Sequence, residues 1–331
     1  MASFLCSTRF FLLILLLSAV PIAYIIHSET SERATHVYSY HSAGWLREST
    51  KWDALNSRFI VSFFEGGLGL IPLNEHHSTG AVLEEIPVVG KSGSGKNSTL
   101  GFVIDRPRNR AVAAIADVLG NKYSAVAAYD LTTWDQLFLT QLSGPDGEKG
   151  FADDVAVDEE GNSYITDTKG NKIWKVGPNG EYLHAIKSPL FTPKEWYYNL
   201  VGLNGIVYHP NGYLLVDHTL TGNLFKVEIG SKSGDEVKVV KIIGGGSLMF
   251  GDGMEILSPT KIVVAGNPSR LVESLDDWET ARIVGKFSGV THRLVTAAFV
   301  KEGKVYLNHL FGLGYPKRKH VLVEAVFSSF K

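Results

Sequence analysis

The chain has 331 residues, a formal net charge of −2 and 44% hydrophobic residues. Its length is enough for one large or two ordinary domains with a substantial core. The near-neutral charge gives no electrostatic basis for binding nucleic acid, so no nucleic-acid partner is expected.

The N-terminus carries an apolar leader. Arg9 is followed by an uncharged run from Phe10 to Ile26, which is the pattern of a secretory signal. A cleaved signal peptide and a retained signal anchor both stay open for residues 1–28, because the run lies at the short end of the spanning range. Either form predicts a secretory-pathway protein: secreted, vacuolar or lumenal, or membrane-anchored with its body on the lumenal side. Membrane contact is expected only through the anchor.

The single cysteine, Cys6, lies in this leader. Disulfides, thiolate metal sites and a cysteine nucleophile are therefore excluded from the rest of the chain. The sequon that starts at Asn97 predicts a glycosylated asparagine on a surface loop, as in other proteins of that compartment.

A repeat follows the leader and a linker at residues 29–44. Short β-branched and aromatic runs alternate with Gly, Asn and Asp turns over residues 45–331. Units with the same strand and turn order start at Asp154, Asn204 and Asp252, and weaker copies begin near residues 48, 101 and 296. The last copy has "HVLVEAVF" as its predicted outer strand. Six four-stranded units predict an all-β fold, a six-bladed β-propeller with a central channel.

The blade period predicts that polar residues converge. The first strand of each blade lines the channel, and all these strands run in the same direction, so the residues just ahead of them meet at one mouth. Glu48, Asp154, Asn204 and Asp252 hold these positions. The second strands return to the same mouth. At their ends lie Asp167, Asp217, His218, Asn267, Asn308 and His309.

Oxygen donors without thiols suit a hard cation, calcium before magnesium. Without a cation the carboxylates would repel one another, and their pKa values would rise. Gly251 and Gly253 would let the backbone turn tightly around Asp252. The alternative is that acids and amides ahead of strands only form turns, but four in phase with the blades favour a metal site. Its predicted ligands are Glu48, Asp154, Asn204 and Asp252.

These motifs resemble the calcium-dependent lactonase and phosphotriesterase propellers of the senescence-marker-protein/gluconolactonase family. Strictosidine-synthase-like and NHL-type propellers are relatives of that family. "DGMEI" at Asp252 and "NGIVY" at Asn204 match two of its boxes, and "ESTKWD" at Glu48 takes the place of the first-blade box. The family's second asparagine is replaced by Asp154 in "DDVAVD". The added negative charge should bind the ion more tightly and lower its Lewis acidity.

The resemblance implies metal-dependent hydrolysis of a small-molecule lactone or related ester, with one catalytic calcium ion that polarises the reacting oxygen. Asp154 and His309 are the candidate general bases. For His309 the resemblance supplies the reason, since the phosphotriesterase branch has a histidine beside the site on its last blade. Candidates for an apolar rim are Phe64, Phe311, Trp196, Tyr197 and Tyr198. The substrate and the oligomeric state are left open.

Two other functions stay open. A non-catalytic, NHL-type binding propeller would use the ion structurally and bind a ligand or partner at the mouth. A strictosidine-synthase-like biosynthetic enzyme would need its own acid or base, and the sequence does not identify one.

Overall fold

The computed structural model describes residues 8–31, 35–73, 81–90, 97–143, 148–230 and 235–329. The chain divides into two compact units, Met1–His36 and Val37–Lys331.

Within its described residues, 8–31 and 35–36, the first unit contains one helix, α2 (Thr8–Thr30), with Pro21 inside it. Its segment Phe10–Thr30 is long and apolar enough to cross a membrane, and the apolar window is not buried. A signal sequence near the N-terminus has the same properties. The helix is thus compatible with both forms of the leader.

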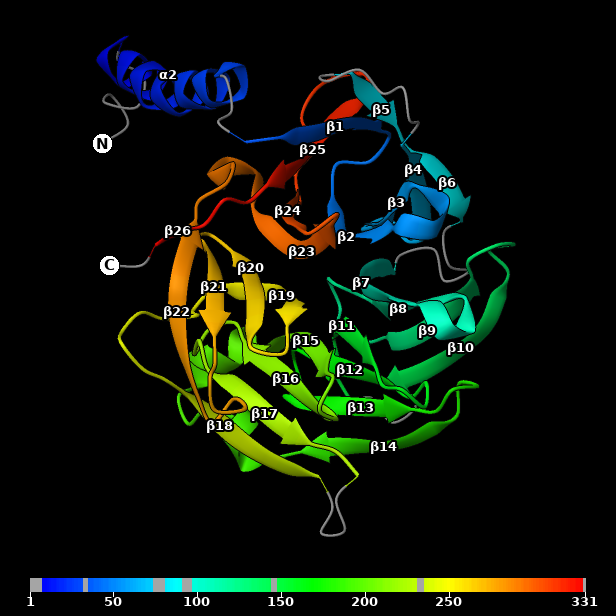
Figure 1. Cartoon of the computed structure of the whole chain (residues 1–331). Coiled ribbons are helices and arrows are strands. Elements are labelled where there is room, and N and C mark those ends of the chain that lie inside the picture. Colours follow the sequence, from blue (N-terminus) through cyan, green and yellow to red (C-terminus); the bar gives the residue numbers. More distant parts are fainter. Residues whose placement is uncertain are drawn as a thin grey trace. The chain divides into compact units, whose positions relative to one another are not determined.

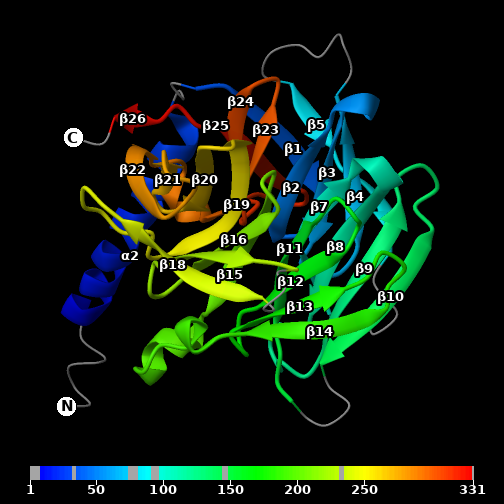
Figure 2. The same cartoon turned by 60° about the horizontal axis from the view of Figure 1, so that its bottom comes forward.

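In the described residues, the second unit is a ring of six four-stranded blades (Figure 1; Figure 2), and the outer strands of the fourth and fifth blades pair in parallel, so these two blades share one sheet. Blades 1 to 3 are β2 (Arg47–Asp53), β3 (Arg58–Phe63), β4 (Leu68–Pro72) and β6 (Ile86–Val89); β7 (Ser98–Asp105), β8 (Arg110–Ala116), β9 (Ser124–Asp130) and β10 (Gln136–Ser143); and β11 (Ala152–Val157), β12 (Ser163–Asp167), β13 (Lys172–Val176) and β14 (Tyr182–Lys187).

Blades 4 to 6 follow in chain order. They are β15 (Leu203–His209), β16 (Tyr213–His218), β17 (Leu224–Glu228) and β18 (Glu236–Ile242); β19 (Gly251–Ser258), β20 (Lys261–Gly266), β21 (Ser269–Glu273) and β22 (Thr280–Phe287); and β23 (Val295–Lys301), β24 (Lys304–His309), β25 (Arg318–Glu324) and β1 (Val37–Ser42).

Short elements complete the unit. β5 (Val82–Glu84) pairs with β1, and β26 (Ser328–Ser329) pairs with β22. The 3₁₀ helices are η1 (Ala54–Asn56), η2 (Arg106–Arg108), η3 (Pro189–Phe191), η4 (Trp196–Leu200) and η5 (Thr291–Arg293).

The innermost strands surround the centre of the ring (Figure 1). Each contacts the innermost strand of the next blade, and β23 contacts β2, which closes the circle. A separate hydrophobic cluster fills each interface between neighbouring blades. The β-branched and aromatic residues of the repeat form these clusters, so the core is divided around the ring and the axis is left to polar side chains.

The closing strand differs from the prediction. The segment "HVLVEAVF" does not form the outer strand of blade 6, since most of it belongs to β25, the third strand. The outer place is taken by β1, which lies within the predicted linker and pairs antiparallel with β25 from Val37↔Val323 to Ser42↔Arg318. This long-range pairing satisfies the backbone groups along the edge of β25. No local pattern near the C-terminus reveals it.

The predicted glycosylation residue Asn97 does not lie on an exposed loop. It directly precedes β7, an innermost strand, and only 6% of it is exposed. A glycan is bulky and belongs on the surface, so the folded unit does not favour modification at this asparagine.

Candidate functional site

Each innermost strand is interrupted near its start by an irregularity in its pairing with the second strand. In β19, Gly251 pairs with Gly266 and Met254 with Val264, so Asp252 and Gly253 together face one residue. β2, β7, β11 and β15 have the same irregularity, and β23 has a shorter version. Such β-bulges bend a strand and change the direction of its side chains. The first bulge residues are Glu48, Leu100, Asp153, Asn204, Asp252 and Thr296.

The structure therefore assigns Asp153 to the position equivalent to Glu48, Asn204 and Asp252. Asp154 is the second residue of its bulge, where blades 2, 4 and 5 have glycines. An added Cβ atom at Gly205 would lie 2.4 Å from the carbonyl oxygen of Asp252. These glycines let neighbouring innermost strands approach closely.

Gly251 has a related role. Neither Gly251 nor Gly253 has a positive φ angle, so the tight turn expected around Asp252 is not what requires them. An added Cβ at Gly251 would lie 2.3 Å from Asp217 Oδ2, and one at Gly253 would lie 2.9 Å from the carbonyl oxygen of Thr296. Lack of space for a side chain, and not backbone conformation, explains both glycines.

Polar side chains on the second strands hold the bulges. The backbone N–H of Gly205 donates to Asp217 Oδ1 at 2.8 Å, and that of Asp154 donates to Thr166 Oγ1 at 3.1 Å. In blade 6, Asn308 Nδ2 donates to the carbonyl oxygen of Glu48 at 2.9 Å. These buried hydrogen bonds fix the backbone at or beside Glu48, Asp153 and Asn204. The side chains of these three residues are thereby kept directed at the channel axis.

The four donors line one small cavity. Glu48, Asp153, Asn204 and Asp252 line it, and the other lining residues include Lys51, Asp154, Gly101 and Thr296. Its volume is ≈ 10 Å³, which is about the space of one water molecule. Glu48, Asp153 and Asp252 are partly exposed, and Asn204 is buried. Four side chains from blades 1, 3, 4 and 5 therefore meet around a space of atomic size.

Burial and mutual repulsion raise the pKa values of these acids. Burial raises the pKa of Glu48 well above its usual value, and Asp252 and Asp153 raise it further. Burial and the negative charge of Asp153 likewise raise the pKa of Asp252 well above its usual value. Burial raises the pKa of Asp153 to about 7, although the Thr168 hydroxyl, 2.9 Å from its Oδ2, works in the opposite direction. The cavity holds carboxyl groups whose negative charge is poorly compensated.

This donor set fits a hard cation in chemistry and in the size of the cavity. Three carboxylates and one amide provide only oxygen ligands, the kind that calcium prefers. Among the described residues, however, no three His, Cys, Asp or Glu side chains are arranged to hold a metal ion together. The carboxylates would have to move closer to one another to coordinate an ion.

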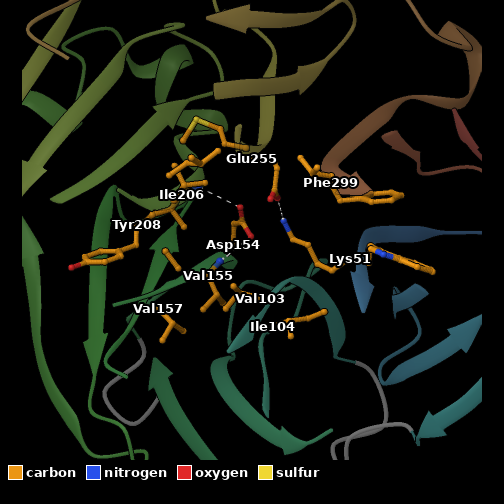
Figure 3. A pocket seen from close by; sticks show the side chains of 16 residues that line it. Lys51, Val103, Ile104, Asp154, Val155, Val157, Ile206, Tyr208, Glu255 and Phe299 are labelled. Carbon is orange, nitrogen blue, oxygen red and sulfur yellow. Dashed lines mark hydrogen bonds and ion pairs between the residues drawn. The ribbon is translucent and has the colours of Figure 1, made fainter. Parts of the chain in front are cut away.

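Asp154 lies between this cavity and a pocket in the far half of the channel (Figure 3). Its carboxylate accepts hydrogen bonds from the backbone N–H groups of Val155 at 2.9 Å and Ile206 at 3.3 Å. Burial raises its pKa to about 6, and the nearby Lys51 lowers it. Lys51 Nζ donates to Glu255 Oε2 at 2.6 Å. The rest of this pocket, with a volume of ≈ 280 Å³, is mainly aliphatic and aromatic.

A second pocket, with a volume of ≈ 330 Å³, lies at the mouth. The four donors line it, which places the acidic cavity beside its interior. Of the predicted apolar rim, Phe64 lines this pocket. Trp196 and Tyr197 are exposed on η4, whose last residue, Leu200, is a lining residue.

The residues at the ends of the second strands do not reach the cavity. Asp167 accepts the backbone N–H groups of Phe151 and Gly170, and His218 Nδ1 accepts one from Thr221. Asn267 donates to the carbonyl oxygen of Thr291. His309 is fully buried, and its Nε2 accepts the N–H of Val290 at 3.2 Å. Successive strand residues face opposite sides, so when Asn308 points to the bulge, His309 points away from it.

No protein-family model matches the chain, and no curated protein matches it either. Solved structures do match. A gluconolactonase from Xanthomonas campestris is 12% identical with a TM-score of 0.56, covering 88% of this chain and 89% of that one. U3-55K is 8% identical with a TM-score of 0.56, covering 89% and 100%. Virginiamycin B lyase from Staphylococcus aureus is 10% identical with a TM-score of 0.51, covering 88% and 99%.

Such low identities establish similarity of fold alone. The chain is a β-propeller whose structural neighbours include a gluconolactonase.

Proposed function

We propose that this protein hydrolyses lactones or related esters with the help of a divalent cation, calcium before others. Glu48, Asp153, Asn204 and Asp252 would hold the ion. The observation that carries the proposal is the convergence of three carboxylates and an amide from four blades on one cavity at the inner end of the mouth pocket. Acids whose pKa values are raised by one another are costly to the fold, and such groups concentrate at functional sites.

Bound calcium would act as a Lewis acid on the substrate carbonyl. Asn204 and the three carboxylates would determine where the ion sits. Asp154 lines the same cavity and remains our candidate for the group that accepts a proton from the attacking water. We no longer propose His309 for this role, because it does not line the cavity or either pocket.

The apolar helix α2 supports a place in the secretory pathway, either as a cleaved signal or as an anchor. Calcium is abundant in that compartment in general, so weak extracellular-type affinity would be sufficient there.

A non-catalytic binding propeller is the second candidate. One observation favours it: the acidic side chains of the described residues are not arranged as a closed metal site. In that case an ion would stabilise the ring and the mouth pocket would bind a ligand without chemical change.

The test compares the full-length protein in detergent with its Asp252→Ala variant. Calcium binding is measured by titration calorimetry, and turnover is measured on lactones, aryl esters and phosphotriesters. We expect the variant to lose at least about tenfold in calcium affinity and nearly all turnover, since it lacks one charged ligand. Asp135→Ala is the matched control, because Asp135 is exposed in the β9–β10 turn.

The outcomes separate the candidates. Calcium binding and turnover that are lost together in Asp252→Ala support the hydrolase. Calcium binding with no turnover of any substrate favours the binding propeller. A wild-type protein that binds no calcium contradicts the metal site.

A further inference from the structure

The ring of bulge residues is chemically asymmetric. Four positions hold oxygen donors, but blade 2 contributes Leu100, which is 1% exposed and lies between the positions of Glu48 and Asp153. Leu100 also lines the mouth pocket. The wall of the pocket beside the acidic cavity is therefore apolar where a symmetric ring would carry another donor.

The same apolar character extends outward from Leu100. Phe64 comes from blade 1, Val118 from blade 2 and Phe151 from the segment ahead of β11. Leu200, 52% exposed, forms part of the rim at the end of η4. Segments from three blades and a 3₁₀ helix thus bring apolar side chains to the pocket above the donors.

Polar side chains also line this pocket. Among the described residues that line the pocket, only Asn121, Thr168 and Lys169 are polar, apart from the four donors. The Thr168 hydroxyl is already engaged, at 2.9 Å from Asp153 Oδ2 and 2.6 Å from the carbonyl oxygen of Leu203. Asn121 and Lys169 are left to serve a substrate.

A sugar lactone carries several hydroxyl groups, and each loses its hydrogen bonds to water when it enters such a pocket. Two side chains cannot replace those bonds, and an unpaired buried hydroxyl is unfavourable. An alkyl or aryl chain loses nothing polar and gains from leaving water.

We propose that the mouth pocket selects lactones or esters with an apolar alkyl or aryl body and discriminates against polyhydroxylated sugar lactones. This inference rests on the proposed function, since it names the substrate class of the same site. Leu200 and Phe151 are the specificity-determining residues: they touch the substrate body and take no part in the reaction.

The first experiment uses three δ-lactones that share one ring: δ-decalactone, δ-valerolactone and glucono-δ-lactone. With full-length protein and calcium, we expect kcat/KM to be at least about tenfold higher for δ-decalactone than for δ-valerolactone, and lowest for glucono-δ-lactone. Phe151→Ala and Leu200→Ala should lower kcat/KM for δ-decalactone about tenfold, mainly through KM, and change that for δ-valerolactone little. Leu119→Ala is the matched control, since Leu119 is 96% exposed and does not line the pocket.

The second experiment separates binding from chemistry. The δ-lactams that correspond to decalactone and gluconolactone cannot be hydrolysed in the same way, and their binding is measured by calorimetry. Tighter binding of the alkyl lactam without turnover of any lactone supports the apolar pocket and contradicts the hydrolase. Glucono-δ-lactone as the best substrate overturns the inference and leaves the hydrolase standing. If neither lactam binds and no lactone is hydrolysed, both are overturned.

Discussion

The two halves of the channel treat their acids in opposite ways, although the same innermost strands build both. At the mouth, Glu48, Asp153 and Asp252 raise one another's pKa values, and none of them takes part in an ion pair within the described chain. A few residues further along the strands, Asp154 and Glu255 lie near Lys51, which makes an ion pair with Glu255.

The difference shows what each half is built for. An acid that faces a fixed ammonium group is compensated and needs no ligand. Acids that raise one another's pKa values reduce stability, and proteins keep such arrangements where function requires them. In the far half a lysine compensates the acids, so the mouth is the half that would gain most from a cation.

Removing the positive charge of Lys51 should have the largest of the predicted effects on stability. Lys51 and Glu255 are only 18% and 25% exposed, so Lys51→Met would leave Glu255 and Asp154 without their partner. We expect a loss of about 2–3 kcal/mol of unfolding free energy, measured by denaturant unfolding. Lys51→Met with Glu255→Met should recover most of this loss, because apolar groups suit the surrounding wall.

A matched control is Lys261→Met. Lys261 pairs with Glu273 at 3.2 Å but is 43% exposed, so its loss should change stability by less than about 0.5 kcal/mol. If Lys51→Met and Lys261→Met lowered the unfolding free energy equally, the ion pair in the channel would stabilise the fold no more than an exposed one.

The next largest effect concerns two neighbouring residues. Asp153→Asn removes a charge from the acidic cavity and should weaken calcium binding about tenfold or more. Asp154→Asn should change calcium affinity only about twofold, since that carboxylate serves Lys51 and two backbone N–H groups. Calorimetry on both variants decides which aspartate belongs to the ion. The reverse order would return the ligand role to Asp154 and refute the assignment from the bulges.

The smallest effect is a pH dependence of stability. The pKa of Asp153 is about 7 in the folded protein against 3.8 ordinarily. The folded state thus binds more protons than the unfolded state, and this stabilising contribution is lost as the pH rises through 7. Glu48 and Asp252 shift in the same direction.

In chelator, we expect unfolding free energy to fall by about 1 kcal/mol between pH 6.5 and 8.5, followed as the thermal midpoint. Asp153→Asn should flatten this slope, and excess calcium should reverse it, because the ion favours the charged acids. If Asp153→Asn showed the same dependence of unfolding free energy on pH, groups other than Asp153 would cause it.

The fold could be predicted because its information is local and repeated. Strand length, turn residues and spacing recur in every blade, so even weak copies support one another. The outer strand of blade 6 could not be found in this way, since β1 pairs with a segment at the other end of the chain. The expected place of Asn97 on an exposed loop differed for a related reason, since its burial depends on neighbours that a sequon does not reveal.

The candidate site was predicted in part. The predicted residues Glu48, Asp154, Asn204 and Asp252 line one cavity, because each stands near the start of an innermost strand. "DDVAVD" offers two aspartates, and the choice depends on the bulge. In "NGI" and "DGM" the donor stands two residues before the first apolar side chain, and the same spacing in "DDV" selects Asp153. That signal was present in the sequence. The orientation of His309 was not, since it depends on which face of β24 packs inward.

The pairing of β1 with β25 has a consequence for how the protein is made. Val37 and Val323 are 286 residues apart in the chain, so at typical synthesis rates β1 leaves the ribosome roughly 15–60 s before its partner. Throughout that time β1 lacks β25, the partner for its backbone hydrogen bonds, and is open to pairing with other chains. The ring closes only when β25, near the end of the chain, pairs with β1. A chaperone would be needed most before that pairing forms.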